Sequence, residues 1–594
     1  MKQTIYGIIY SLKSLGKKRK DGIMTQSNGM GAPSWRDVYQ QWLAQPDLDP
    51  EIWNELVTLW DSIEGEDAKA IEEGEDRFYR ELAFGTGGLR GKLGAGTNRM
   101  NRYTIEKTTR GVISYIKKYA LGQKVAIGYD SRIMSREFGE LSGRLVKESG
   151  LTACIYDTLM PAPALSFATR YHKCAMGIMI TASHNPSEYN GYKVYNSRGC
   201  QVTEREASLI LEEIQNQPWF STKEKAKPGT LHWMGKDTKE AYYQQVLLQR
   251  MDISCEDLNL VYSPLNGAGL EPVQEIFRRI QVGKVWVVPE QEAPDGNFPT
   301  CPYPNPEKKE ALALSLQLAQ EHQADMVMAT DPDCDRVGIG VRHQGEYYLP
   351  TGNEVGLLLA DFLCQQRKSK GTLPKNPLIV RTIVSTPMVD RIGRTYGVRV
   401  EATLTGFKYI GEKIGVLEDL GREEEYLFGF EESYGYLAGT YVRDKDGVNA
   451  VMLICEMAAW YKTQGKTLIH RLEELYQEYG YTKNHLLDFQ FPGAKGMETM
   501  GRLMEEWRQQ PPQEVAGYKV KQVVDYLPGG DLPPSDVVEV KLQGETGFTI
   551  RPSGTEPKLK IYLFGNGNTR EEVEKWLENM ADYFTQWVKE KVKE

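Results

Sequence analysis

An apolar run that stops at a cluster of polar residues is the feature that most restricts how this chain can fold. Residues 175–180 are all apolar or glycine, and they are followed at once by Thr181, Ala182, Ser183, His184, Asn185 and Pro186. A short apolar run that ends in polar residues and a proline is typical of a buried parallel strand. In open α/β sheets, the carboxyl ends of such strands carry the chemistry. Ser183 is therefore either a presented nucleophile or an ordinary turn residue.

Similar strand-like runs recur along the chain and alternate with helical segments. They cover residues 125–129, 258–263, 285–288, 326–330, 378–384 and 426–430. This alternation predicts parallel sheets covered by helices, repeated more than once, and hence an α/β fold class. The last hundred residues differ, because their pattern predicts strands around a loop followed by one long helix. The strands are expected at 518–526, 537–542 and 558–563, and the helix at 571–592.

The residues before the first of these strands read differently. Residues 52–63 and 68–82 carry apolar side chains at helical spacing, so two helices are expected there. Residues 1–23 hold a brief apolar patch followed by basic residues, which is the reverse of the order in a signal peptide, and the patch is too short to span a bilayer. We expect residues 1–23 to be dispensable.

Composition and charge restrict the partners of the chain. Its 594 residues carry a net charge of −9 with no basic stripe, which argues against a nucleic-acid-binding surface. No apolar stretch has the length of a membrane helix, so no membrane partner is expected either. The eight cysteines form no C-x-x-C pair, which favours reduced thiols in a cytoplasmic protein over a disulfide framework or a zinc site.

Three carboxylates alternate directly after the run 326–330, at Asp331, Asp333 and Asp335. A loop that curls at a strand end can turn all three toward one hard cation, and oxygen ligands suit Mg²⁺. A calcium EF-hand does not fit, because Arg336 stands where that loop needs glycine and Arg342 where it needs glutamate. On residue types alone, a solvated acidic turn remains an alternative.

Three further loops combine glycine with polar side chains. The glycine-rich segment 84–92 is neither a Walker loop, which Thr86 and Leu93 exclude, nor a dinucleotide fingerprint, which Arg90 excludes. Segment 429–435 follows a strand and offers a carboxylate with a hydroxyl two residues on. Segment 551–558 combines a guanidinium, two hydroxyls and a glycine-freed backbone, which is either a phosphate cradle or a plain β-turn.

Taken in order, these loops resemble the signature loops of the α-D-phosphohexomutase family. Segment 181–186, with 190–193, is similar to the family's active-site serine loop, and 331–336, 429–435 and 551–558 are similar to its metal, sugar and phosphate loops. Phe430 and Tyr434 are closest to the phosphoglucomutase and phosphopentomutase branch. The resemblance covers roughly residues 84–563.

The resemblance implies an α/β, four-domain architecture around a central cleft. Three similar α/β domains with mixed sheets would be followed by a C-terminal α+β domain. We place an N-terminal extension, expected to be disordered, at 1–34, and domains with the serine, metal, sugar and phosphate loops at 35–225, 226–342, 343–485 and 486–594. The resemblance also implies that hinge motion closes the cleft.

The same resemblance assigns roles to individual residues. Ser183 would carry a phosphoryl group, and the catalytic set would be Ser183, Arg90, Lys193, Lys408 and His184. The metal would be held by Ser183, Asp331, Asp333 and Asp335. Substrate would be bound by Arg336, Glu431, Ser433, Arg551, Ser553, Gly554, Thr555 and Lys558.

The expected activity is that of an α-phosphoglucomutase, which interconverts glucose 1-phosphate and glucose 6-phosphate. Mg²⁺ is the expected cofactor, glucose 1,6-bisphosphate the intermediate and activator, and sugar phosphates the partners. A phosphopentomutase, a phosphomannomutase or a sugar-bisphosphate synthase of the same family is the alternative, and a metal-dependent phosphatase or a non-catalytic cation-binding protein is a rival from another class. The sequence does not decide the oligomeric state, and both a monomer and a dimer are compatible with it.

Overall fold

The computed structural model describes residues 33–85, 87–220, 227–491, 493–553 and 558–593. The chain divides into two compact units, residues 1–80 and 81–594. Within the described ranges, every helix is too short or too polar to cross a bilayer. The segment 1–23, and with it nearly all of the expected N-terminal extension, lies outside the described residues.

The first unit contains three helices in its described part. They are α2 (Trp35–Leu43), α3 (Pro50–Glu64) and α4 (Ala68–Phe78), and their first turns are capped by Ser34, Asp49 and Asp67. The rings of Tyr39 and Trp42 pack on Phe78 in a buried core. Helix α4 ends at Phe78 rather than at the predicted residue 82, because Leu82 packs into the core of the second unit instead.

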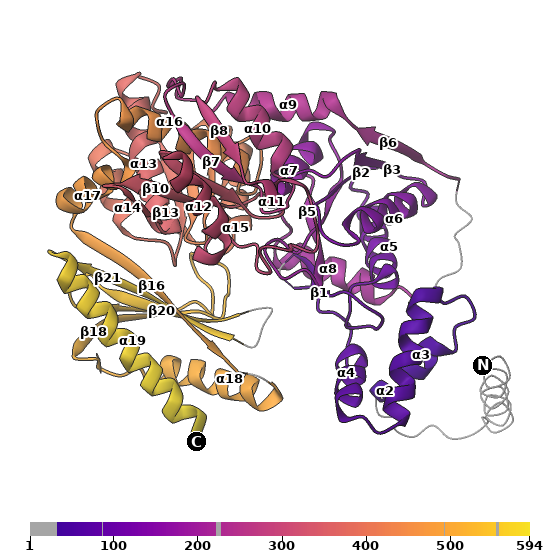
Figure 1. Ribbon diagram of the computed structural model, residues 1–594. Helices are drawn as coiled ribbons and strands as arrows, with labels where there is room; N and C mark the ends of the chain where they lie inside the picture. The colour runs from indigo at the N-terminus through magenta and orange to yellow at the C-terminus, as the bar shows by residue number, and fades with distance from the viewer. Residues whose placement is uncertain (1–32, 86, 221–226, 492, 554–557, 594) are drawn as a thin grey trace, which may run out of the picture. The chain divides into compact units, whose positions relative to one another are not determined.

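The second unit begins with a mixed six-stranded sheet (Figure 1). Its strand order is β1-β5-β4-β2-β3-β6, and its strands are β1 (Gly88–Lys92), β2 (Lys124–Tyr129), β3 (Thr152–Tyr156), β4 (Met176–Ile180), β5 (Tyr189–Asn196) and β6 (Thr230–Met234). Its helices are α5 (Arg102–Lys118), α6 (Ser135–Glu148), α7 (Ala162–Tyr171) and α8 (Glu204–Gln215).

Strand β1 lies inside the segment that the sequence presented as a glycine-rich loop. It pairs antiparallel with β5, so that Arg90 faces Gly191 across the ladder. A Cβ on Gly88 would lie 2.2 Å from the carbonyl oxygen of Tyr192. At this position the glycine serves close strand packing, a role that the sequence pattern did not separate from anion binding.

The second sheet has the order β11-β10-β9-β7-β8. Its strands are β7 (Asn259–Ser263), β8 (Lys284–Val287), β9 (Met326–Thr330), β10 (Val337–His343) and β11 (Glu346–Tyr348). Helices α9 (Lys236–Leu247), α10 (Leu270–Arg279) and α12 (Ala313–His322), with the single turn α11 (Pro289–Glu292), accompany it.

The third sheet has the order β13-β12-β14-β15. Its strands are β12 (Leu378–Thr382), β13 (Arg399–Thr403), β14 (Tyr426–Glu431) and β15 (Gly435–Ala438). Its helices are α13 (Gly352–Ser369), α14 (Met388–Tyr396), α15 (Phe407–Asp419), α16 (Gly447–Lys462) and α17 (Leu468–Tyr479).

These three sheets repeat one topology. In each, the first strand lies between the second and the third, both parallel to it, and a fourth strand returns antiparallel beside the third: β2-β3-β4-β5, β7-β8-β9-β10 and β12-β13-β14-β15. The expectation of three similar α/β domains with mixed sheets is therefore confirmed. The sequence shows no such repeat, because the topology is kept while the residues differ.

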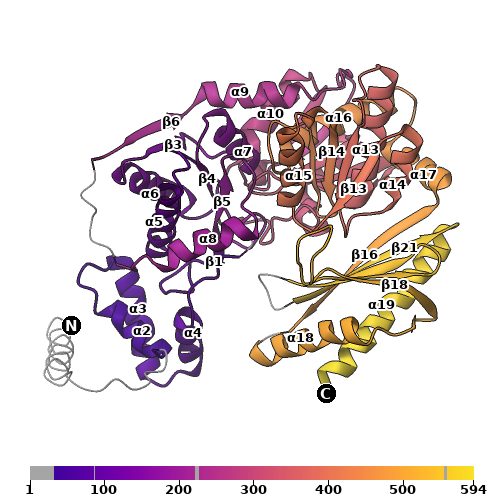
Figure 2. The same ribbon diagram turned by 180° about the vertical axis from the view of Figure 1, so that it is seen from behind.

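The fourth sheet is antiparallel throughout its described strands, in the order β16-β21-β20-β19-β18-β17. The strands are β16 (Tyr481–Gln490), β17 (Glu514–Val515), β18 (Tyr518–Asp525), β19 (Val538–Leu542), β20 (Gly547–Pro552) and β21 (Lys558–Gly567). Helices α18 (Gly493–Gln509) and α19 (Arg570–Lys593) lie beside this sheet (Figure 2). They bury Trp507 and Phe584 against Phe548 of the sheet. This is the α+β domain that the sequence predicts.

The sheets revise the domain limits proposed from the sequence. The limit at 225/226 leaves β6 outside the first sheet, the limit at 342/343 cuts β10, and the limit at 485/486 cuts β16. Strands β6 and β16 lie at the edges of their sheets, where strands are often polar and carry little apolar signal, whereas β10 is cut in its polar end, next to the edge strand β11. We propose limits near residues 235, 350 and 480 instead.

Candidate active site

Three loops that occupy the same place in the three repeated sheets form the candidate site. Each connects the third strand of its sheet to the fourth: residues 181–188 between β4 and β5, 331–336 between β9 and β10, and 432–434 between β14 and β15. Each contains a residue with left-handed backbone, namely Ser183 (φ 52°), Cys334 (φ 48°) and Tyr434 (φ 63°). Such strain persists where the surrounding structure holds it, and it clusters at functional sites.

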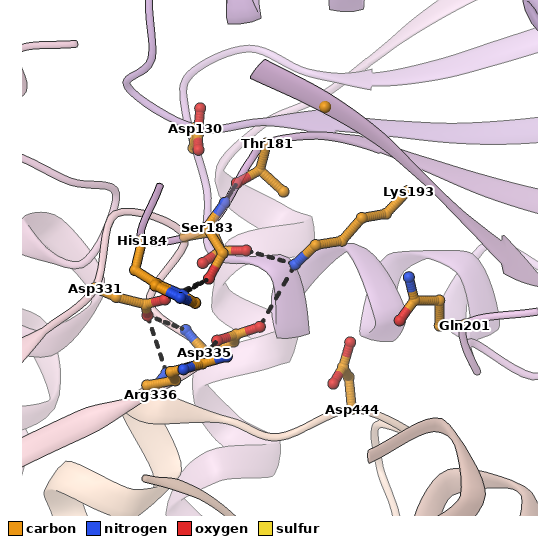
Figure 3. Close-up of polar contacts among 12 residues, drawn as sticks. Asp130, Thr181, Ser183, His184, Lys193, Gln201, Asp331, Asp335, Arg336 and Asp444 are labelled. Atoms are coloured by element: carbon orange, nitrogen blue, oxygen red, sulfur yellow. Dashed lines mark hydrogen bonds and ion pairs between the residues drawn. The ribbon is translucent and has the colours of Figure 1, made fainter. Parts of the chain in front are cut away.

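Ser183 lies where the first and second sheets meet. Its hydroxyl donates to Asp331 Oδ2 at 2.7 Å and lies 3.1 Å from His184 Nδ1, while its backbone N–H donates to Thr181 Oγ1 at 2.8 Å (Figure 3). The side chain is nearly buried, at 6% exposure. The hydroxyl is thus aimed at a carboxylate 148 residues away in sequence rather than at solvent.

Arg132 holds the loop around Ser183 by hydrogen bonds, and the sequence pattern did not predict this residue as part of the site. The guanidinium donates to the carbonyl oxygens of three residues of this loop, Ser183 (3.2 and 2.5 Å), Asn185 and Pro186 (2.9 Å), and to that of Tyr189 (3.0 Å), the first residue of β5. Burial lowers the pKa of Arg132, while Asp130 opposes the shift. Arg90 adds a second restraint, since its Nη1 donates to Asn185 Oδ1 at 3.0 Å.

The predicted metal residues form one compact, buried cluster. Ligand oxygens of Asp331, Asp333 and Asp335 all lie within 4.8 Å of one another, and the three side chains are at most 1% exposed. Within the described part of the chain, Asp333 Oδ1 and Asp335 Oδ1 accept no hydrogen bond. Buried carboxylate oxygens without donors are costly unless a cation binds them, so these residues fit a divalent metal ion.

Cations surround the cluster. Lys193 Nζ lies 2.7 Å from Asp333 Oδ2 and 3.6 Å from Asp335 Oδ2.

Burial raises the pKa of Asp331 well above its ordinary value, and its neighbours Asp333 and Asp335 raise it further. Conversely, burial lowers the pKa of the His184 imidazole, with Arg336 and Arg90 acting in the same direction, so this ring is neutral at pH 7.

Arg336 joins the metal loop 331–336 to the long segment between β8 and β9, which contains Glu307. Its Nη1 pairs with Glu307 Oε1 at 2.7 Å, and its backbone N–H donates to Asp331 Oδ1 at 3.0 Å. Its Nε lies 3.8 Å from Asp335 Oδ1. Its assignment to substrate stays a prediction.

The sugar-loop residues lie at the end of β14. Glu431 is 4% exposed, and its Oε1 accepts the N–H of Gly406 at 2.9 Å. Burial raises the pKa of Glu431 to about 7; Glu432 adds to the shift, whereas Lys445 and Arg336 oppose it. Ser433 stands two residues on, half-buried in the turn.

The ammonium group of Lys408 forms an ion pair with an acidic residue of helix α8. Lys408 is the second residue of α15, where its Nζ pairs with Glu204 Oε1 of α8 at 2.7 Å, and the same oxygen accepts from Tyr409 at 2.5 Å. Lys408 is nearly buried, at 6% exposure. The pair links helix α15 of the third sheet to helix α8 of the first sheet. The sequence pattern gave no indication that these two residues are close.

The phosphate-loop residues occupy the hairpin between β20 and β21. Arg551 faces Lys560 across the ladder, Ser553 N–H donates to Lys558 carbonyl oxygen at 2.7 Å, and Lys558 Nζ lies 3.8 Å from Asp488. Gly554 and Thr555 lie outside the described residues. Burial lowers the pKa of Lys560, and Arg551 lowers it further, so two cations share this hairpin; Lys560 was not predicted.

This hairpin is close to the sugar loop. The guanidinium of Arg551 lowers the pKa of Glu432, although burial raises that pKa overall. Tyr409, Ile383 and Tyr562 belong to one buried cluster that joins the third and fourth sheets. The site thus has two parts. Ser183, the three aspartates and Lys193 contact one another directly, and the sugar loop adjoins the phosphate-loop hairpin.

Comparison with family models identifies three successive domains. Residues 81–219, 240–345 and 351–479 match the models described as phosphoglucomutase/phosphomannomutase, alpha/beta/alpha domain I, domain II and domain III. Each matched segment contains one of the repeated sheets for the most part, and each contains one of the three loops.

Relatives and solved structures agree with these models. Phosphoglucomutases of Staphylococcus haemolyticus and Staphylococcus aureus are each 34% identical, over 84% and 87% of this chain and 93% and 95% of theirs. Two structures share the fold: a phosphoglucomutase/phosphomannomutase family protein of Burkholderia thailandensis (TM-score 0.64, 17% identity, 86% of this chain and 97% of that one) and the phosphoglucomutase parafusin of Paramecium (0.64, 18%, 86% and 95%). This chain belongs to the phosphoglucomutase/phosphomannomutase family, the α-D-phosphohexomutases.

Proposed function

We propose that the chain is an α-phosphoglucomutase, an intramolecular phosphotransferase that interconverts glucose 1-phosphate and glucose 6-phosphate through phosphorylated Ser183. One observation carries the proposal. The Ser183 hydroxyl lies 2.7 Å from Asp331 within a cluster of three carboxylates and a lysine, at the point where two sheets meet. A serine placed in this way can receive and return a phosphoryl group.

The proposed reaction has two transfers that mirror each other. In the first, the bond between phosphorus and Ser183 Oγ breaks and Ser183 Oγ takes up a proton, while a new bond forms to the free hydroxyl oxygen of the sugar monophosphate, which loses its proton to a neighbouring base. The sugar bisphosphate then turns around. In the second transfer, Ser183 Oγ loses its proton and accepts the other phosphoryl group, and the released sugar oxygen takes up a proton.

The chain's own residues would hold this reaction in place. Because the transition state of phosphoryl transfer is loose, catalysis rests on positioning and charge. Lys193 and Arg90 supply fixed positive charge beside the serine loop, and Glu431 with Ser433 would accept and donate hydrogen bonds to adjacent sugar hydroxyls. Arg551 and its hairpin would bind the phosphate that is not transferred.

Asp331, Asp333 and Asp335, joined by a phosphoryl oxygen on Ser183, would hold Mg²⁺. Once bound, Mg²⁺ would neutralise negative charge on the transferring phosphoryl group. The oxygen-only, fully buried ligand set supports a hard divalent ion over zinc or copper. The requirement for a site shielded from water supports closure of the cleft around the substrate.

The state of the cysteines bears on the cellular compartment of the enzyme. All eight cysteines are buried and free, which supports a reducing compartment, and we place the enzyme in the cytoplasm. Its partners would be small sugar phosphates.

A coupled assay separates this function from its rivals. Conversion of glucose 1-phosphate would be followed with and without glucose 1,6-bisphosphate, beside release of inorganic phosphate. A mutase requires the bisphosphate and releases almost no phosphate, whereas a phosphatase releases phosphate stoichiometrically. Mannose, ribose and deoxyribose 1-phosphates run in parallel would identify a phosphomannomutase or phosphopentomutase, and glucose 1-phosphate converted more slowly than any of them would refute the proposed specificity.

A further inference from the structure

A short segment of the third sheet unit, residues 443–447, leads into the first residue of α16 and contacts both other repeated units. Arg443 N–H donates to Ser166 Oγ of α7 at 2.9 Å, and Asp444 Oδ2 accepts from Tyr195 of β5 at 2.8 Å. Gly447 N–H donates to the carbonyl oxygen of Cys334, in the metal loop, at 3.1 Å. A Cβ on Gly447 would lie 2.6 Å from that oxygen, so the segment requires this close approach.

Lys445 stands at the middle of this segment and reaches the metal cluster. Its Nζ lies 2.8 Å from Asp335 Oδ2 and 3.4 Å from Asp444 Oδ1, and its side chain is 12% exposed. A Cβ on Gly435, the first residue of β15, would lie 2.3 Å from Lys445 Cδ. The strand that leaves the sugar loop thus makes room for the lysine stem, and the ammonium is directed at a predicted metal ligand.

The cluster is therefore neutralised from two sides. Lys193 comes from β5 of the first sheet and pairs with Asp333, while Lys445 comes from the third sheet unit and pairs with Asp335. Both ammonium groups would stay within a few ångströms of any cation bound by these carboxylates. Because like charges repel strongly in a buried site, such a lysine opposes cation binding even as it holds the ligand in place.

We propose that Lys445 is a positioning residue of the metal site, which holds Asp335 and competes by charge with the bound divalent cation. This inference rests on the proposed function, because it takes the three aspartates to bind that cation. It predicts an effect with an unusual sign. A residue needed merely as a spacer would weaken metal binding when removed, whereas removal of a competing charge tightens it.

The test is calorimetric titration of Mg²⁺ into the full chain after removal of metal by chelation. Lys445→Met should bind Mg²⁺ at least about tenfold more tightly than wild type, and Lys445→Gln should shift in the same direction. Lys445→Arg, which keeps the charge, should stay close to wild type. Lys239→Met is the matched control, because Lys239 is 11% exposed and pairs with Asp157 and Glu271 away from the cluster; its affinity should not change.

Thermal unfolding gives a second reading of the same variants. Without Lys445 the apo cluster loses a neutralising charge, so Mg²⁺ should raise the Tm of K445M and K445Q more than that of wild type. Unchanged or weaker Mg²⁺ binding by both neutral variants would overturn the proposal, as would their failure to fold with and without Mg²⁺. Asp333→Asn separates the two levels. If D333N abolishes Mg²⁺ binding while K445M leaves it unchanged, the metal site stands and the role of Lys445 falls; if D333N binds like wild type, both fall.

Discussion

Arg132→Met should loosen the Ser183 loop selectively. The substitution keeps an aliphatic stem of similar length but removes the donors that bind four carbonyl oxygens of residues 183–189. A hydrogen bond from a charged donor contributes about 1.5–3 kcal/mol. The four contributions are not additive, and loss of one partner from a buried charged network typically costs about 3–5 kcal/mol. We therefore expect the loop to open roughly 100- to 5,000-fold more often.

Hydrogen–deuterium exchange measured by mass spectrometry tests this directly. Peptides that cover residues 181–192 should lose protection in R132M, while peptides that cover β9 and β21 should keep it. Turnover should fall by at least about 100-fold, because a misplaced reacting group forfeits the gain of orientation. Arg471→Met is the control, since Arg471 is a partly buried arginine, 13% exposed, that pairs with the buried Asp361 of helix α13 and makes no contact with the Ser183 loop in the described residues. Unchanged exchange in 181–192, or equal loss of protection throughout R132M, would refute the role of Arg132.

Two further predictions concern substrate binding. Arg551→Ala should lower kcat/KM by about 10- to 150-fold in both directions, since one charge-assisted hydrogen bond of about 1.5–3 kcal/mol is lost whichever phosphate is distal. The control Arg508→Ala breaks pairs with Asp525 and Asp536 in the same domain and should leave kcat/KM unchanged. An effect of Arg551→Ala on one substrate alone would contradict the binding of the distal phosphate by Arg551. Because the pKa of Glu431 is about 7 in the folded chain, the carboxylate that accepts sugar hydroxyls is lost as pH falls, so KM should rise about tenfold from pH 8 to pH 6. Glu431→Gln should flatten that profile, and a wild-type profile in E431Q would argue against Glu431 as a sugar ligand. Folding stability changes in the opposite direction to substrate binding: because the pKa of Glu431 is raised from 4.5 to about 7 on folding, wild type should lose stability relative to E431Q as pH rises from about 4.5 to about 7 and change little above that.

Much of the architecture could be predicted from apolar runs, because buried parallel strands are continuous and apolar. Strand β9 has the limits predicted for it, and β7, β12, β14 and α19 differ from their predictions by a few residues at one or both ends. Edge strands such as β6, β11 and β16 were missed or assigned to the wrong domain, because they alternate or are largely polar and so resemble loops. The threefold repeat was invisible for a related reason, since strand order leaves no trace in local sequence.

The site divides along a similar line. Ser183 and Asp331 were recognisable because each follows an apolar strand in a dense motif, and their contact joins two such motifs. Arg132 and Lys445 were not singled out, since each acts through contacts with residues far away in sequence and an isolated arginine or lysine is usually solvent-exposed. The role of Lys408 stays a prediction, and its pairing with Glu204 could be found only in three dimensions.

Transfer of a labelled phosphoryl group tests the central claim, that Ser183 carries the phosphoryl group, most directly. The enzyme would be labelled with radioactive glucose 1,6-bisphosphate, digested with trypsin and mapped, then chased in a parallel sample with unlabelled glucose 1-phosphate. We predict that the label lies on Ser183 in peptide 174–193, is absent from Ser183→Ala, is retained in the neighbouring control Ser187→Ala, and moves to the sugar on chase. Label on another residue, equal labelling of Ser183→Ala, or release of the label as inorganic phosphate would contradict the account.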